Sequence, residues 1–113
     1  MSVSLHDHIE AIEAGYEFLL AYAAQGREND DGSETRTTLS AMRDAAAGIV
    51  AMLGGESEGF LPVVVDDARK SAAAIELVLA QDGISSELVD NLNASIHLRA
   101  LLTDLFLLSD TID

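Results

Sequence analysis

The chain has 113 residues, with 20 acidic and 6 basic side chains and a formal net charge of −14. This length suits one compact domain, which we predict to span residues 1–113. The chain contains no cysteine, so disulfides, thiolate metal sites and thiol catalysis are excluded. The acidic charge repels phosphate groups, and the basic side chains are scattered. Because the first residues also lack the basic-then-apolar pattern of a signal peptide, we expect a cytoplasmic protein with no nucleic acid and no membrane among its partners.

The first two predicted elements are helices, because apolar residues recur at steps of three and four. The first covers residues 5–25, with Ser4 as its N-cap and Gly26 as its stop. After a polar link, the second helix ends at Gly54 and Gly55. The two apolar stripes are Leu5, Ile9, Ile12, Tyr16, Leu19 and Ala23, and Leu39, Met42, Ala46, Ile49 and Leu53.

Two more predicted helices complete the chain. The third has a proline in its first turn and ends at Asp82 and Gly83, although the β-branched run 63–65 leaves a short strand as the alternative. Its apolar stripe is Leu61, Val65, Ala68, Ala72, Ile75 and Leu79. Ser85 or Ser86 opens the fourth, which covers residues 87–110. Short links make neighbouring helices antiparallel, so the predicted fold is all-α, an up-down-up-down four-helix bundle.

The fourth predicted helix is apolar around most of its circumference. Two apolar stripes lie about 120° apart in projection, and one bundle of this size cannot cover both. We therefore predict a homo-oligomer, while a wide core face with ordinary exposed leucines is the alternative. The predicted interface is Leu98, Leu101, Leu105, Leu108 and Ile112. The narrow polar band left on this helix contains Asp90, Asn93, His97 and Asp104.

Arg99 interrupts the other stripe between Leu92 and Leu102, with Ser95 about one turn earlier. An unpaired buried charge is too costly to persist, so Arg99 either snorkels at an edge or is held by a carboxylate inside the packed region. We expect the second arrangement, in which Arg99 and Ser95 set the register of the helix. The candidate acceptors are Asp66, Asp67 and Glu76, besides an acid of a partner chain.

His6, Glu10 and Glu13 lie along one face of the first predicted helix. An imidazole and carboxylates at this spacing can ligate a divalent metal. Di-iron bundles, however, use Glu-x-x-His units, and this sequence contains none. We expect a solvated acidic face without metal or cofactor, and His6, Glu10 and Glu13 are the candidates if a metal binds.

Two short segments resemble histidine phosphotransfer sequences. Residues 5–7, Leu-His-Asp, resemble the Leu-His-Asp of one histidine-kinase subfamily, and residues 95–100 are similar to the His-x-Leu-Lys-Gly helix of phosphotransfer modules. The second resemblance implies that His97 carries a phosphoryl group. The base follows His97 by two residues instead of three, and Leu101 replaces the glycine that lets a response regulator approach.

Gly15 lies inside the first predicted helix, where it costs about 1 kcal/mol relative to alanine. Close approach of a neighbouring helix explains this glycine, and a small ligand beside Tyr16 and Tyr22 is the alternative. No set of catalytic residues converges in the sequence. The predicted function is therefore a non-enzymatic, self-associating interaction, adaptor or regulatory module with an unknown protein partner. A histidine phosphotransfer or metal-binding four-helix bundle is the alternative.

Overall fold

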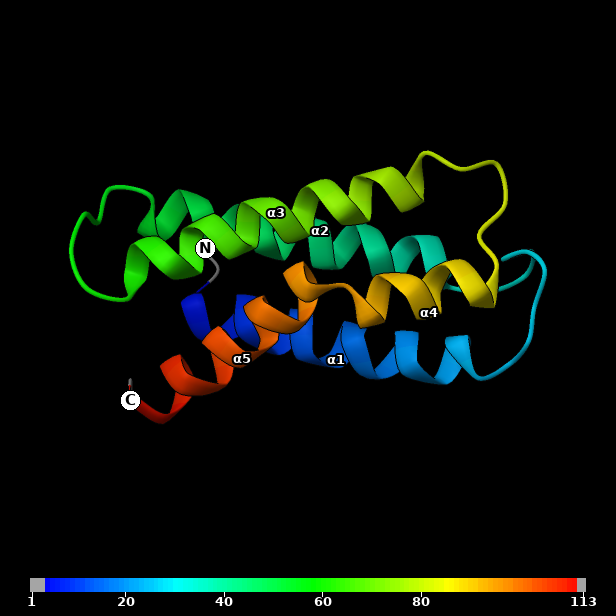
Figure 1. Cartoon of the computed structure of the whole chain (residues 1–113), viewed down its shortest axis with the longest axis horizontal. Coiled ribbons are helices and arrows are strands. Elements are labelled where there is room, and N and C mark those ends of the chain that lie inside the picture. Colours follow the sequence, from blue (N-terminus) through cyan, green and yellow to red (C-terminus); the bar gives the residue numbers. More distant parts are fainter. Residues whose placement is uncertain (1–3, 112–113) are drawn as a thin grey trace.

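The structure, a computed structural model, describes residues 4–111 as an all-helical, compact chain (Figure 1). Its five helices are α1 (Leu5–Ala23), α2 (Thr35–Leu53), α3 (Leu61–Leu79), α4 (Ser86–Ala94) and α5 (Ile96–Thr111). Residues 63–65 are helical, so the alternative of a short strand is wrong. Within the described range, no helix is long and apolar enough to cross a membrane.

The start of α1 follows from a capping box. The Asp7 amide donates to Oγ of Ser4 at 3.1 Å, and the Ser4 amide donates to the Asp7 carboxylate at 3.2 Å. These bonds satisfy amides that have no partner inside the helix. The predicted N-cap is confirmed. After α1 the chain turns at Gly26, whose φ of 67° lies in the left-handed region that glycine tolerates best.

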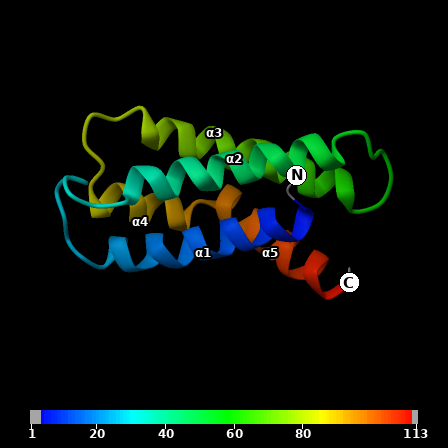
Figure 2. The ribbon, with the colours of Figure 1, turned by 180° about the vertical axis from the view of Figure 1, so that it is seen from behind.

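The helices share one apolar core. α1 packs mainly against α2 and α4, whereas α3 packs mainly against α2 and α5. Figure 2 shows α1 and α2 side by side along most of their length. By contrast, α1 and α5 make few contacts. Core residues come from all five helices, so the core runs through the centre of the described structure.

The predicted fourth helix is wrong in one respect, because the chain leaves the helical path at Ser95 and forms α4 and α5 instead (Figure 1). Ser95 has φ −63° and ψ 140°, an extended conformation. Its hydroxyl accepts the Leu98 amide at 3.3 Å, so the side chain caps the start of α5. The Ser71 hydroxyl on α3 donates to the carbonyl of His97 at 2.9 Å.

At one end of the molecule, a polar network that we call the clasp (residues 22–36 and 79–86) joins two loops. The Tyr22 hydroxyl lies 2.6 Å from the Ile84 carbonyl and 2.9 Å from the Asn29 carbonyl. The Ser86 hydroxyl donates to the Tyr22 carbonyl at 2.7 Å and accepts the Arg27 amide at 2.8 Å. These bonds tie the α1–α2 loop to the α3–α4 loop across the end of the core.

Asp30 and Arg36 complete the clasp. The Asp30 carboxylate accepts the Ile84 amide at 2.9 Å and Nε of Arg36 at 2.8 Å. The Arg36 guanidinium also donates to carbonyls at the end of α3, including those of Leu79 at 3.0 Å and Gln81 at 2.6 Å. The backbone hydrogen bond from Ile84, together with Arg36, lowers the pKa of Asp30. The clasp therefore gives a carboxylate and helix-end carbonyls the donors they need.

Gly15 and Gly48 bring α1 and α2 close together. A Cβ at Gly15 would lie 2.4 Å from Cγ of Met42, and one at Gly48 would lie 2.3 Å from the ring of His8. The Met42 side chain thus occupies the space beside Gly15, which confirms close packing as the reason for this glycine. Tyr22 is buried with its hydroxyl bonded to backbone carbonyls.

Candidate functional site

The predicted interface leucines are buried in the core of the chain itself. Leu98 and Leu105 are 0% exposed and Leu101 is 1% exposed, and Leu108 belongs to the same core cluster. The prediction that these four leucines face a partner is wrong, because α5 turns this stripe toward the other helices. Ile112 lies outside the described residues.

An open apolar groove lies instead between α1 and α5. It has a volume of about 340 Å³. Leu20 on α1 is 48% exposed and Phe106 on α5 is 54% exposed. The groove is open because α4 lies along α1, whereas α5, beyond the break at Ser95, lies along α3. We call this surface the α1/α5 groove; its lining residues are Glu13, Tyr16, Glu17, Leu20, Leu102 and Phe106.

One apolar stripe of the predicted fourth helix is divided between core and surface, because Leu92 and Leu102 are buried and Phe106 is not. The stripe assigned to a partner fills the core, while Phe106, from the stripe assigned to the core, is exposed. Leu102 is buried at the floor of the groove. The two stripes differ in polarity as well, since Ser95 and Arg99 interrupt the stripe that contains Phe106.

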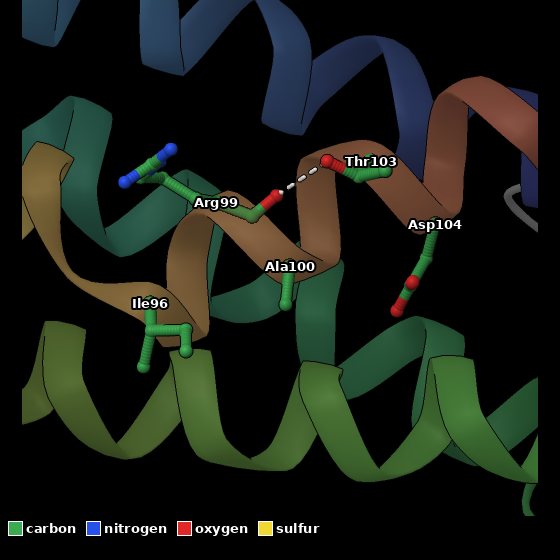
Figure 3. Close-up of a pocket in the computed structure, with 5 residues that line it drawn as sticks. All are labelled: Ile96, Arg99, Ala100, Thr103 and Asp104. Carbon is green, nitrogen blue, oxygen red and sulfur yellow. Dashed lines mark hydrogen bonds between the residues drawn. The ribbon is translucent and has the colours of Figure 1, made fainter.

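Arg99 is exposed and forms no ion pair with any carboxylate of residues 4–111. It lines a shallow depression of about 420 Å³ with Ile96, Ala100, Thr103 and Asp104 (Figure 3). In Figure 3 the Arg99 and Asp104 side chains point in different directions. The prediction that Arg99 is buried against Asp66, Asp67 or Glu76 is therefore wrong, while an acid of a partner chain stays a prediction. The polar break in the helix comes from Ser95, whose hydroxyl caps α5.

Asp104 and Asn93, both predicted in the polar band, are buried. Asp104 points from α5 toward α3 (Figure 3) and is 6% exposed. Burial raises the pKa of Asp104 to about 7, and hydrogen bonding with Asp67 and the charge of Asp67 on α3 add to the shift. Within the part of the chain that the structure describes, neither Oδ2 of Asp104 nor the side-chain amide of Asn93 has a hydrogen-bond partner.

The Asp67/Asp104 pair is not among the predicted sites, although the sequence carries a signal for the burial of Asp104. Asp104 lies three residues after Leu101 and four before Leu108, so it shares a helical face with two core leucines. Asp67 and Asp104 belong to helices α3 and α5, and no sequence spacing shows that the two helices meet there.

The residues proposed for metal binding do not form a cluster. His6 and Glu10 are one turn apart and lie 3.2 Å from each other, both exposed. Glu13 lines the α1/α5 groove instead. Within residues 4–111, no group of three or more His, Asp or Glu side chains has a geometry that could hold a metal ion.

His97, the candidate phosphoryl carrier, lies in the first turn of α5 and is exposed. Its carbonyl accepts the Ser71 hydroxyl of α3, and the following residue, Leu98, is part of the core. Leu101, which stands where phosphotransfer modules have glycine, is buried. Phosphotransfer through His97 stays a hypothesis.

Comparisons of this chain with protein-family models, with curated proteins and with solved structures give no match. The candidate function therefore depends on the geometry of the chain alone.

Proposed function

We propose that the protein is a non-enzymatic interaction module that self-associates through the α1/α5 groove. The supporting observation is the exposure of Leu20 and Phe106 above a floor formed by Leu102. Each apolar side chain that a partner fully covers contributes about 1.5–3 kcal/mol before the costs of association. An exposed apolar groove with a charged rim is typical of an interaction surface.

The charges beside the groove favour a second copy of this chain as its occupant. Glu13 and Glu17 line the α1 side, and Arg99 lies one turn before Leu102 on α5, exposed and without an ion pair among residues 4–111. A second copy would supply apolar side chains together with an acid for Arg99 and a base for Glu13 or Glu17. The net charge of −14 opposes the encounter of two copies, so salt should strengthen association by screening it.

The same proposal includes the finer architecture. We infer that α4 and α5 together act as the fourth member of an up-down-up-down four-helix bundle, which forms a single domain over residues 1–113. A cytoplasmic location, with neither nucleic acid nor membrane as a partner, fits the net charge of −14.

Light scattering coupled to size exclusion tests the proposal. We expect the unaltered chain to be a dimer at tens of micromolar in high salt and Phe106→Ser to be a monomer. Leu77→Ser is the matched control, because Leu77 is 67% exposed on α3 and lies outside the groove; this variant should stay dimeric. A monomeric unaltered chain under these conditions, or equal dimer loss in both variants, contradicts the proposal.

A further inference from the structure

Asp104 is a buried acid whose Oδ2 atom has no donor among residues 4–111. Its side chain points from α5 to α3 (Figure 3), it is 6% exposed, and Oδ2 has no hydrogen-bond partner. Burial removes the water that would solvate such a carboxylate, and no protein donor takes the place of that water, so the charged form is destabilised. If the carboxyl is protonated, its O–H can instead donate to the Asp67 carboxylate, so a single shared proton gives both groups a partner.

Among residues 4–111, no basic side chain offsets the charge at this position. On α3, Lys70 pairs with Asp66 at 3.0 Å, and both partners are exposed. On α5, Arg99 points away from Asp104 (Figure 3). Among the described residues of α1, α3 and α4, which pack against α5, Asp67 is the one whose charge and hydrogen bonding act on Asp104. Two ionised carboxylates would therefore repel each other across the α3/α5 contact.

We propose that Asp67 and Asp104 form a proton-operated latch, which holds α5 against α3 while the pair shares a proton and loosens α5 when both carboxyls are ionised. The extended residue Ser95 supplies the hinge, because the helical hydrogen-bond ladder is interrupted between α4 and α5. Loosening α5 would expose the core leucines Leu101 and Leu105. The latch does not depend on the α1/α5 groove, since Asp104 points toward α3 (Figure 3) and neither aspartate lines the groove.

The direction of the pH effect follows from proton linkage. The pKa of Asp104 rises from an ordinary 3.8 to about 7 in the folded chain, so the folded state binds this proton more tightly than the unfolded state. The stabilisation is complete below the ordinary value, decreases as the pH rises through about 7, and is absent above that range. The latch is thus closed in mild acid and open in mild alkali.

Two measurements on the full chain test the latch. In a carboxyl-carbon NMR titration, we expect Asp104 to titrate near pH 7 and its midpoint to fall in Asp67→Asn, where an amide replaces the second charge. In hydrogen exchange corrected for intrinsic rates, opening of α5 should increase at least about tenfold between about pH 5 and pH 8. Asp104→Asn should reduce that increase to less than about twofold.

Asp110→Asn is the matched control, because Asp110 is an exposed aspartate on the same helix, and it should leave both results unchanged. An Asp104 midpoint below about pH 5 in the unaltered chain, or an unchanged pH dependence of α5 in Asp104→Asn, would overturn the latch. Should Asp104→Asn fail to fold, the titrations of the unaltered chain and of Asp67→Asn still decide between a shared proton and two independent carboxylates.

Discussion

The clasp and the α3/α5 contact hold the same chain together by opposite means. In the clasp, Asp30 receives the Ile84 amide and the Arg36 guanidinium, and its pKa is lowered. At the α3/α5 contact, Asp104 receives no donor at Oδ2 and faces Asp67, and its pKa is raised. Residue type alone therefore does not decide what a carboxylate contributes; the groups around it decide both the size and the sign of its effect.

This contrast also separates a fixed end from a movable one. The clasp links two loops through bonds to backbone carbonyls, so neither loop can move without breaking several of them. One hydrogen bond, from the Ser71 hydroxyl to the His97 carbonyl, ties the start of α5 to α3. The rest of the attachment of α5 depends on core leucines and on an acid pair that is sensitive to pH. We expect α5 to be the first element to open.

The largest expected effect comes from the apolar attachment of α5. Leu105→Ala should lower the free energy of unfolding by about 3 kcal/mol, because Leu105 is 0% exposed and its truncation leaves a cavity. Leu107→Ala is the control, since Leu107 is its exposed neighbour on α5, and it should change stability by less than about 0.5 kcal/mol. Urea denaturation measures both, and equal effects would mean that the buried stripe is assigned to the wrong face.

Breaking the clasp is expected to have the next largest effect. Arg36→Ala removes the donor to Asp30 and to the carbonyls of Leu79 and Gln81. Part of the guanidinium is exposed, at 39%, so water replaces some of these bonds and the loss should be about 2 kcal/mol. Arg43→Ala, which removes an arginine paired only with its exposed neighbour Asp44, should be nearly neutral in the same denaturation experiment.

The ends of the helices could largely be predicted from the sequence, because their signals are local. Ser4 marks a helix end through its side chain and Gly26 through its left-handed backbone, while Gly54 caps α2 with a helical φ of −64°. The first three apolar stripes were also predicted, since each lies within an unbroken helix. Local chemistry is thus sufficient where one residue acts on its immediate neighbours.

The candidate sites could not be predicted in this way, because they depend on one local break with distant consequences. Ser95 looked like an ordinary residue within an apolar helix, yet its extended backbone turns α5 toward α3. That turn buries Asp104, exposes Phe106 and opens the α1/α5 groove. A projection that assumes one continuous helix therefore misplaces later residues such as Asp104 and Phe106.

The clasp and the latch should also differ in acid. Because the pKa of Asp30 lies below its ordinary value of 3.8, its contribution is complete above that value and is lost as the pH falls through the folded pKa. Stability should therefore decrease in strong acid through Asp30 and in mild alkali through Asp104. In a plot of the urea midpoint against pH, these two losses form an acid limb and an alkaline limb. Asp30→Asn should make the loss in acid smaller and leave the loss in alkali unchanged. The reverse assignment of the two limbs would contradict the comparison.

The smallest expected effect concerns Arg99, which belongs to neither the clasp nor the latch. Its side chain is exposed and forms no ion pair within residues 4–111, so Arg99→Ala should change the free energy of unfolding by less than about 0.5 kcal/mol. The measurement belongs at a concentration low enough to keep the chain monomeric, because the proposed dimer would add its own stabilisation. A loss of about 3 kcal/mol or more would instead place Arg99 in a buried ion pair, and the orientation of α5 beyond Ser95 would then be wrong.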